Sequence, residues 1–204
     1  MGTSQPETPE NVVALFAGSR GLEARPDDEL MLLARGGRRD AFDVLVRRHQ
    51  LAALKLASKY LGEVAAARDA CQNAFLELYR GLPRYRAQGR FDFFLRRVVL
   101  NQCRMLGRGA RIGERALSSA PLLTTGDGTP APDDALLAAE RRRDVDRALG
   151  QLSDKLREVV VLRYTGGHSL EEIAAILELP LGTVKSRLFA AMEKLKGHLE
   201  GGAP

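Results

Sequence analysis

The sequence contains few aromatic residues and no long apolar run. It has no tryptophan, and aromatic residues make up only 5% of its 204 positions. A chain so poor in aromatic residues and rich in Leu and Ala favours helices over sheets, so we expect an all-α protein. No apolar run approaches the roughly 20 residues that span a bilayer, and no basic leader precedes an apolar core. We therefore expect a cytoplasmic protein without membrane insertion of its own.

The sequence also lacks a recognisable metal or catalytic constellation. Cys71 and Cys103 do not form a CxxC pair and have no histidine near them in the sequence, so we interpret both as small packing residues. We expect His49, His168 and His198 to lie alone on helix surfaces or turns, without a carboxylate partner. There is no set of nucleophile, base and orienting group, no paired carboxylates and no phosphate-binding loop. We therefore predict a protein that is not an enzyme, with no catalytic residue, no metal and no cofactor.

Positive charge is concentrated in one stretch of the chain. The whole sequence has a formal net charge of +5, whereas residues 79–115 contain ten Arg, no Lys and two acids, for a net charge of +8. The same stretch holds five of the eleven aromatic residues, which are Tyr79, Tyr85, Phe91, Phe93 and Phe94. Arg binds phosphates, and aromatic faces stack on unpaired bases. The combination indicates a nucleic acid with an opened strand; the alternative is a solvated helix whose aromatic residues form its core face.

Helix breakers and periodicity divide the chain into five parts. Residues 1–24 form an extension rich in Pro, Gly, Ser and Thr, and residues 25–110 contain four helical stretches of a length that can form one bundle. Residues 111–135 have the composition of a flexible linker, residues 136–200 contain three or four further helices, and residues 201–204 are a short tail. We expect two small helical domains, an N-terminal helical bundle and a C-terminal helix-turn-helix domain, joined by that linker.

The helix-turn-helix prediction depends on the last third of the chain. Ser169 followed by Glu172 predicts a capping box at the start of one helix, and the short segment ELPLGT separates this helix from an amphipathic stretch at residues 179–196. In that stretch Val184 belongs to the apolar stripe, whereas Phe189 lies about 140° away from it, among lysines. Phe189 therefore either faces DNA, where it would touch a thymine methyl group or a sugar, or packs on a neighbouring helix.

Four stretches of the sequence resemble a known family. They are DELMLLARGGRRDAFDVLVRRH, DACQNAFLELYRGLPRYR, FLRRVVLNQ and LREVVVLRYTGGHSLEEIAAILELPLGTVKSRLFAAMEKL. The last is the most specific, because EEIA and GTVKSRL follow an upstream REVxxLR. Over residues 27–199 the chain resembles the extracytoplasmic-function (ECF) sigma factors of bacterial RNA polymerase, a branch of the sigma-70 family. The resemblance implies a first domain that binds the polymerase clamp and opens the minus-10 element, and a helix-turn-helix domain that reads the minus-35 element.

The resemblance also implies roles for individual residues. The residues that match the minus-35 contacts of the family are Thr183, Lys185, Ser186, Arg187 and Phe189. The residues that match its minus-10 segment are Tyr85, Arg86, Arg90, Phe91, Phe94, Arg97 and Asn101. The residues on the helix that meets the polymerase clamp are Asp69, Gln72, Phe75 and Leu76. The chain departs from the family at positions that are commonly acidic, Ala66, Arg68 and Asn73, and at positions that are frequently Arg, Ala190 and Met192.

The partners that the resemblance implies are the RNA polymerase core, through its clamp, promoter DNA and an anti-sigma factor. Two other functions fit the residues taken alone. One is a helix-turn-helix regulator that never joins polymerase, which would leave the basic and aromatic stretch at 79–115 without a purpose. The other is a helical adaptor that binds only protein.

Overall fold

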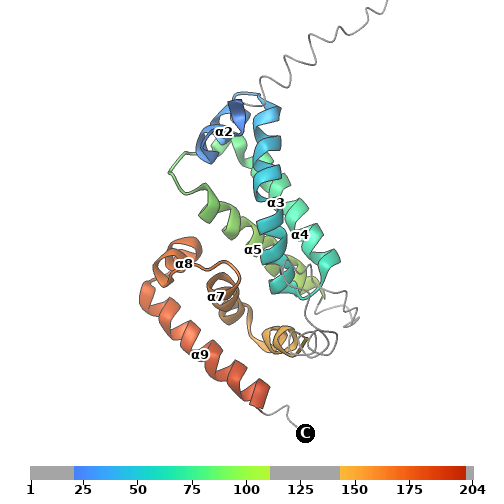
Figure 1. The fold of residues 1–204 in the computed structure, drawn as a ribbon, viewed down its shortest axis with the longest axis vertical. Helices are drawn as coiled ribbons and strands as arrows, with labels where there is room; N and C mark the ends of the chain where they lie inside the picture. The colour runs from blue at the N-terminus through green and yellow to red at the C-terminus, as the bar shows by residue number, and fades with distance from the viewer. Residues whose placement is uncertain (1–20, 111–142, 201–204) are drawn as a thin grey trace, which may run out of the picture.

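In the computed structural model the described residues, 21–110 and 143–200, are helical and include no strand (Figure 1). The elements of the first part are α2 (Asp27–Arg35), α3 (Arg39–Leu61), α4 (Val64–Gly81), the 3-10 turn η1 (Leu82–Arg84) and α5 (Phe91–Ala110). Those of the second part are a helix over 143–151, α7 (Asp154–Tyr164), α8 (Leu170–Leu177) and α9 (Leu181–Glu200). The all-α prediction is confirmed.

The first domain is a bundle of α3, α4 and α5, and α2 packs against α3 and η1. Its core is mainly aliphatic and includes four aromatic side chains, Phe42, Tyr60, Tyr85 and Phe91. The largest side chains buried there are Tyr60 and a set of aliphatic residues that includes Leu30, Met31, Leu45, Leu56, Leu78 and Leu100. Cys71 and Cys103 are also buried, which confirms them as packing residues. α3 ends at Gly62, whose left-handed φ of 75° lets its N–H donate to the Ser58 carbonyl oxygen at 2.9 Å.

The folded structure begins earlier than residue 25. Leu22 is only 1% exposed, and Glu23 forms an ion pair with Arg47 at 2.8 Å. Arg48 also donates to the Glu23 carbonyl oxygen at 2.8 Å. Residues 21–24 are therefore part of the first domain. The rest of the expected extension, the expected linker and the short tail lie outside the described residues.

The second domain is formed by α7, α8 and α9, with α8 and α9 as the two helices of a helix-turn-helix. The predicted capping box is present: Ser169 Oγ accepts from the Glu172 N–H at 3.1 Å, and Glu172 Oε2 accepts from the Ser169 N–H at 2.8 Å. Ile173 and Val184 are completely buried between the helices. Ser153 stands at the N-cap of α7, although its side chain makes no capping hydrogen bond.

The two domains pack against each other, with α3 beside α7 and α5 beside α8 (Figure 1). Arg157 on α7 is 7% exposed, and its guanidinium donates at 3.2 Å to the carbonyl oxygen of Tyr60 on α3. The same guanidinium donates at 2.9 Å to the carbonyl oxygens of Leu149, Gly150 and Leu152. One buried side chain thus connects the first domain with the end of the helix over 143–151 and with the turn that precedes α7.

Candidate nucleic-acid interfaces

The first candidate interface is the outer face of α9. Its apolar stripe, which includes Val184, holds the helix to its own domain, and this leaves Phe189 70% exposed. Lys185 and Ser186 are exposed beside it, and the Ser186 hydroxyl donates to the carbonyl oxygen of Thr183, which is half-buried, at 3.1 Å. The alternative in which Phe189 packs on a neighbouring helix is therefore excluded in this structure.

Arg187 lies on the opposite side of α9 from Phe189. It lines a cavity of about 150 Å³ between the domains, together with Arg97, Arg104 and Glu158. A step of two residues turns a helix by about 200°, so Arg187 and Phe189 cannot face the same partner. Arg187, expected with the minus-35 contacts, is directed at the first domain in this arrangement.

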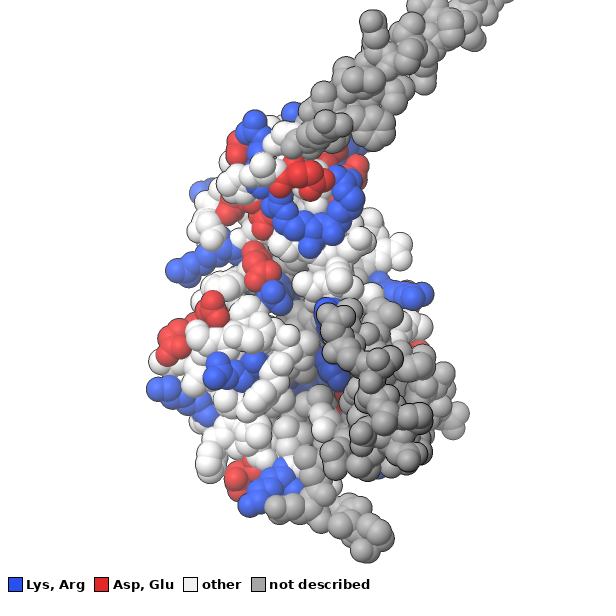
Figure 2. All heavy atoms as spheres, viewed as in Figure 1, with Lys and Arg blue, Asp and Glu red and all other residues white. Residues whose placement is uncertain are grey.

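The second candidate interface is a basic and aromatic pocket of about 610 Å³ at the junction of the domains. The first domain supplies Arg84, Tyr85, Arg86, Gln88, Arg90, Phe93, Phe94 and Arg97. The helix-turn-helix supplies Ala174, Ala175, Glu178 and Leu179. Figure 2 shows basic side chains on both halves of the molecule with acidic ones interspersed, so charge is not confined to one patch. The structure therefore brings most of the expected minus-10 residues together, against a wall formed by the second domain.

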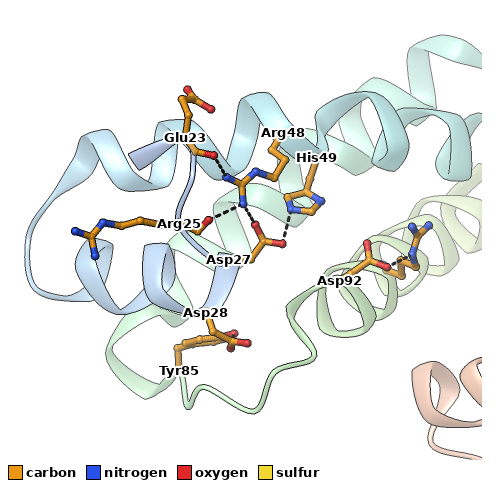
Figure 3. A network of polar contacts seen from close by, with 9 residues as sticks. Glu23, Arg25, Asp27, Asp28, Arg48, His49, Tyr85 and Asp92 are labelled. Carbon is orange, nitrogen blue, oxygen red and sulfur yellow. Dashed lines mark hydrogen bonds and ion pairs between the residues drawn. The ribbon is translucent and has the colours of Figure 1, made fainter. Parts of the chain in front are cut away.

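Tyr85 anchors the loop that carries these arginines (Figure 3). Its hydroxyl donates to the Asp28 carboxylate, and its carbonyl oxygen accepts from Arg35 at 3.0 Å. The Asp28 carboxylate also accepts from the Gln88 N–H at 3.3 Å. Burial, with the neighbouring Asp28 carboxylate, raises the pKa of Tyr85 and keeps its hydroxyl protonated as a donor.

Of the aromatic residues expected at the minus-10 surface, two are in the core. Tyr85 is 8% exposed and Phe91 is 3% exposed. The Phe91 ring lies 6.4 Å from the Tyr85 ring and 5.2 Å from the His49 ring, so it is enclosed by the bundle. Phe94, 36% exposed and 5.9 Å from Tyr85 between ring centroids, is the residue of this group that can stack on a base. For Tyr85 and Phe91 the alternative interpretation of the sequence is correct: these aromatic residues pack in the core and are not exposed to a nucleic acid.

Two residues of the pocket contact the second domain directly. Arg97 forms an ion pair with Glu178, and the Phe93 ring lies edge-on to the His168 ring with centroids 6.2 Å apart. Phe93 belongs to the aromatic cluster visible in the sequence, but its contact with the helix-turn-helix depends on the packing of the two domains. Asn101 is half-buried one turn further along α5, where its side-chain oxygen accepts from Arg104.

The expectation that the histidines lack carboxylate partners is wrong for two of them. His49 Nε2 lies 2.9 Å from Asp27 Oδ2, and Figure 3 shows the Asp27 carboxylate between His49 and Arg48. His168 is 7% exposed and has Glu172 Oε2 3.4 Å from its Nδ1. The His49 pair joins residues 22 positions apart, which spacing in the sequence does not reveal. The described residues contain no group of three side chains able to hold a metal ion.

Three of the four residues expected to meet the polymerase clamp, Gln72, Phe75 and Leu76, line an apolar groove of about 480 Å³ between α3 and α4, and Asp69 does not line it. Asp69, Gln72 and Leu76 are exposed and Phe75 is half-buried. The groove floor includes Phe42, whose ring lies edge-on to that of Tyr79 at 5.1 Å. Cys71 also lines the groove, and burial raises the pKa of its thiol to about 11, so it is not a reactive thiolate.

These features define a class of two-domain, all-helical protein with a helix-turn-helix in one domain and an arginine- and aromatic-rich surface in the other. Two protein families match the chain: the family described as Sigma-70 region 2 matches residues 45–111, and the family described as Sigma-70, region 4 matches residues 142–195. The RNA polymerase sigma-H factor of Pseudomonas aeruginosa is 30% identical over 186 residues, which cover 88% of this chain and 96% of that protein. The ECF RNA polymerase sigma-E factor of Escherichia coli K12 is 31% identical over 187 residues, which cover 87% and 96%.

The chain belongs to the ECF sigma factors of the sigma-70 family. Among solved structures, CnrH in complex with the cytosolic domain of CnrY has a TM-score of 0.64 and 29% identity, over 87% of this chain and 99% of that chain. The sigma factor RpoE of Bartonella quintana, solved with the anti-sigma factor NepR, has a TM-score of 0.57 and 20% identity over 79% and 98%, and supports the fold. The protein is an alternative sigma factor that directs transcription initiation with RNA polymerase. None of its described helices is long and apolar enough to cross a membrane.

Proposed function

We propose that the two candidate interfaces divide promoter recognition between them. The exposed face of α9 reads the minus-35 duplex, and the pocket around Phe94 holds the opened minus-10 strand. The observation that carries this assignment is the position of Phe189, 70% exposed between exposed lysines on the second helix of a helix-turn-helix. A large apolar side chain exposed there is stabilised by contact with a base edge or sugar.

At the minus-35 element, the contact that each side chain of α9 makes with DNA follows from the chemistry of that side chain. Lys185 can reach a phosphate or a base edge, and Ser186 can donate or accept one hydrogen bond. Thr183 lies in the first turn, where the helix N–H groups attract a phosphate. Arg187 faces the first domain from the opposite side of α9, so it is not one of the proposed minus-35 contacts.

At the minus-10 element, Phe94 supplies the stacking surface, and arginines on both sides supply phosphate contacts. Arg84, Arg86 and Arg90 are exposed and line the pocket with Phe94. Such a combination binds single strands with little dependence on base identity, because every base has a stacking face. Tyr85 and Phe91 support this surface from the core, where they fix the loop and the start of α5.

The groove between α3 and α4 fits a helical partner from the polymerase. Its apolar floor, with Arg68 and Gln72 as polar lining residues, matches the amphipathic surface that a coiled-coil clamp presents. A partner of the anti-sigma class is supported by CnrH, whose structure was solved with the cytosolic domain of CnrY. We place the protein in the cytoplasm, because that is where its proposed partners, polymerase and promoter DNA, meet.

The closed arrangement of the domains has a consequence for this function. The pocket at the minus-10 surface is walled by Ala174, Ala175 and Glu178 of the second domain, and Glu178 pairs with Arg97. Two promoter elements separated along a duplex cannot both be bound while these surfaces touch. The second domain therefore moves away from α5 when the protein binds promoter DNA with polymerase.

The experiment that tests the assignment is reconstitution with core RNA polymerase. The purified protein is expected to elute with the core and to produce promoter-specific run-off transcripts from its own genomic DNA. Substitutions of Lys185 and Phe189 should lower duplex binding, whereas substitutions of Phe94 should lower opening. Failure to elute with the core, together with the absence of transcripts, would contradict the assignment.

A further inference from the structure

The exposed face of α9 continues onto α7 as one apolar patch. It consists of Tyr164, Phe189 and Met192, which are 64%, 70% and 41% exposed. Tyr164 is the last residue of α7, and its hydroxyl lies 3.7 Å from Met192 Sδ, so its side chain reaches across to α9. Phe189 and Tyr164 are the two most exposed large apolar residues in the part of the chain that the structure describes.

Charge flanks this patch along the helix axis. At 100° per residue, the side chains of Lys185, Phe189, Met192 and Lys196 fall within an arc of about 60°. The outer face of α9 therefore presents a cation, two apolar groups and a second cation in line. Glu193 borders this stripe, and its carboxylate would repel a phosphate placed there. Phosphate contacts are thus favoured at the two ends of the stripe, and the apolar centre is left for groups inside the groove.

Duplex DNA has one apolar group that such a centre can recognise from the major groove, the C5-methyl group of thymine. The lysines at either end match the phosphates that border the groove. The patch is also continuous with the helix face to which the minus-35 contacts are assigned. Met192 stands at a position that is frequently Arg in the family, so an apolar contact replaces a cationic one here.

We propose that Tyr164 and Met192 are specificity-determining residues that, with Phe189, form a surface for thymine methyl groups in the minus-35 duplex. The proposal rests on the assignment of α9 to that element. Tyr164 comes from outside the recognition helix, and its contact with Met192 holds both side chains at the edge of the patch. The protein therefore selects minus-35 sequences with thymine at defined positions, and its discrimination there depends on the methyl group.

The test uses the holoenzyme reconstituted with core RNA polymerase and a promoter identified by run-off transcription. Each minus-35 thymine is replaced in turn by deoxyuridine, which keeps every hydrogen-bonding group and lacks only the methyl group. We expect one or two replacements to weaken binding by about fourfold, the change that burial of one methyl-sized group brings. Tyr164→Ala and Met192→Ala should weaken binding of the thymine promoter and lose this sensitivity at one of the same positions.

Two controls isolate the effect. Met105→Ala removes a methionine that is 59% exposed on α5, away from the patch, and should keep the full sensitivity to deoxyuridine. Melting temperatures of the variants should match that of the parent, because the replaced side chains are exposed. The proposal is overturned if the parent is insensitive at every position, or if Tyr164→Ala and Met192→Ala respond to deoxyuridine as the parent does.

Failure of the underlying assignment gives a different result. If Lys185→Ala and Phe189→Ala bind the same promoter as tightly as the parent, or if no promoter is found, α9 does not read the minus-35 element and both proposals fail. If those two variants bind weakly while the deoxyuridine effects are unchanged in Tyr164→Ala and Met192→Ala, only the methyl-recognition proposal fails.

Discussion

The two candidate DNA surfaces of this sigma factor differ in how much of each is exposed to solvent and how much contacts the other domain. On α9, Phe189 and Lys185 are exposed to solvent, and the helix is held from behind by its own domain. At the start of α5, Phe93 and Arg97 instead contact the other domain through His168 and Glu178. The proposed minus-35 surface is thus exposed in the free protein, whereas the proposed minus-10 surface is partly enclosed by the second domain.

This difference fits the two forms of DNA proposed for these surfaces, duplex DNA for α9 and a single strand for the pocket on α5. Duplex DNA is the resting form of a promoter, so a surface that reads it gains from being preformed. A single strand exists only after opening, and an exposed arginine- and aromatic-rich surface would bind other single strands without sequence preference. On the proposed assignment, enclosure of this pocket limits the binding of other single strands before polymerase and duplex are engaged.

The largest effect is expected at the residue that joins the two regions. Arg157→Ala removes the donor that Arg157 provides to the carbonyl oxygens of Tyr60 and Leu152 in a buried site. We expect the free energy of unfolding to fall by about 3 kcal/mol or more, since each unsatisfied buried group costs about 1–3 kcal/mol. Urea denaturation measures the loss.

Arg147→Ala is the matched control for that measurement. Arg147 is exposed and pairs with Asp144 at 3.3 Å on the surface, so its removal should change stability by less than about 0.5 kcal/mol. Equal effects of the two substitutions would show that Arg157 does not hold the domains together.

The next largest effect concerns the exposed surface. Phe189→Ala should weaken binding of the minus-35 duplex by about 1–3 kcal/mol, because it removes an apolar base contact. The melting temperature should not change, since the side chain is 70% exposed. A large drop in melting temperature would identify Phe189 as a packing residue instead.

A smaller effect is expected at the enclosed surface. Replacement of both Arg96 and Arg97 by Ala should reduce promoter opening and lower the slope of log affinity against log salt by about 1–2. In the free protein Arg96 donates to Asp92 at 2.7 Å and Arg97 pairs with Glu178, so both must exchange partners to reach DNA. An unchanged salt slope in the opening reaction would count against phosphate contact by either residue.

The smallest effect is a pH dependence at the domain boundary. Glu158 is 3% exposed beside Arg104, and burial raises the pKa of its carboxyl above the ordinary value of 4.5. The folded state therefore holds this proton more tightly than the unfolded state, and the stability that Glu158 contributes falls as pH rises through the raised pKa.

Glu158→Gln tests directly whether the charge on Glu158 lowers the stability of the folded protein as pH rises. The amide carries no charge to desolvate, so we expect the variant to lose less stability than the parent between pH 5 and pH 8. Urea denaturation at both pH values gives the comparison. A steeper loss in the variant would mean that attraction to Arg104 outweighs burial.

Local features of this fold could be predicted from the sequence, because their causes lie within a few residues. The capping box of Ser169 and Glu172 and the position of Phe189 off the apolar stripe both follow from spacing along one helix. Spacing leaves open whether Phe189 faces outward or packs on a neighbouring helix, and the structure shows it exposed. The two helical domains follow in the same way from periodicity and breakers.

Features that depend on packing could not be predicted in this way. The pairing of His49 with Asp27 and the burial of Phe91 require α2, α3 and α5 to meet. The direction of Arg187 and the wall that Glu178 forms beside the minus-10 surface require the two domains to pack together. The basic and aromatic stretch at 79–115 indicates a nucleic-acid surface in the sequence. Only the packing of the helices shows that Phe94 is exposed enough to stack on a base, whereas Phe91 is buried.

Transcription from a pre-opened promoter tests the division between the two surfaces most directly. Phe94→Ala and Phe189→Ala holoenzymes are compared on a fully duplex promoter and on the same promoter with an unpaired minus-10 bubble. We predict that both variants are defective on the duplex, and that the bubble restores transcription by Phe94→Ala but not by Phe189→Ala. Restoration of both variants, or of Phe189→Ala alone, would contradict the assignment of α9 to the minus-35 element and of the α5 surface to the opened strand.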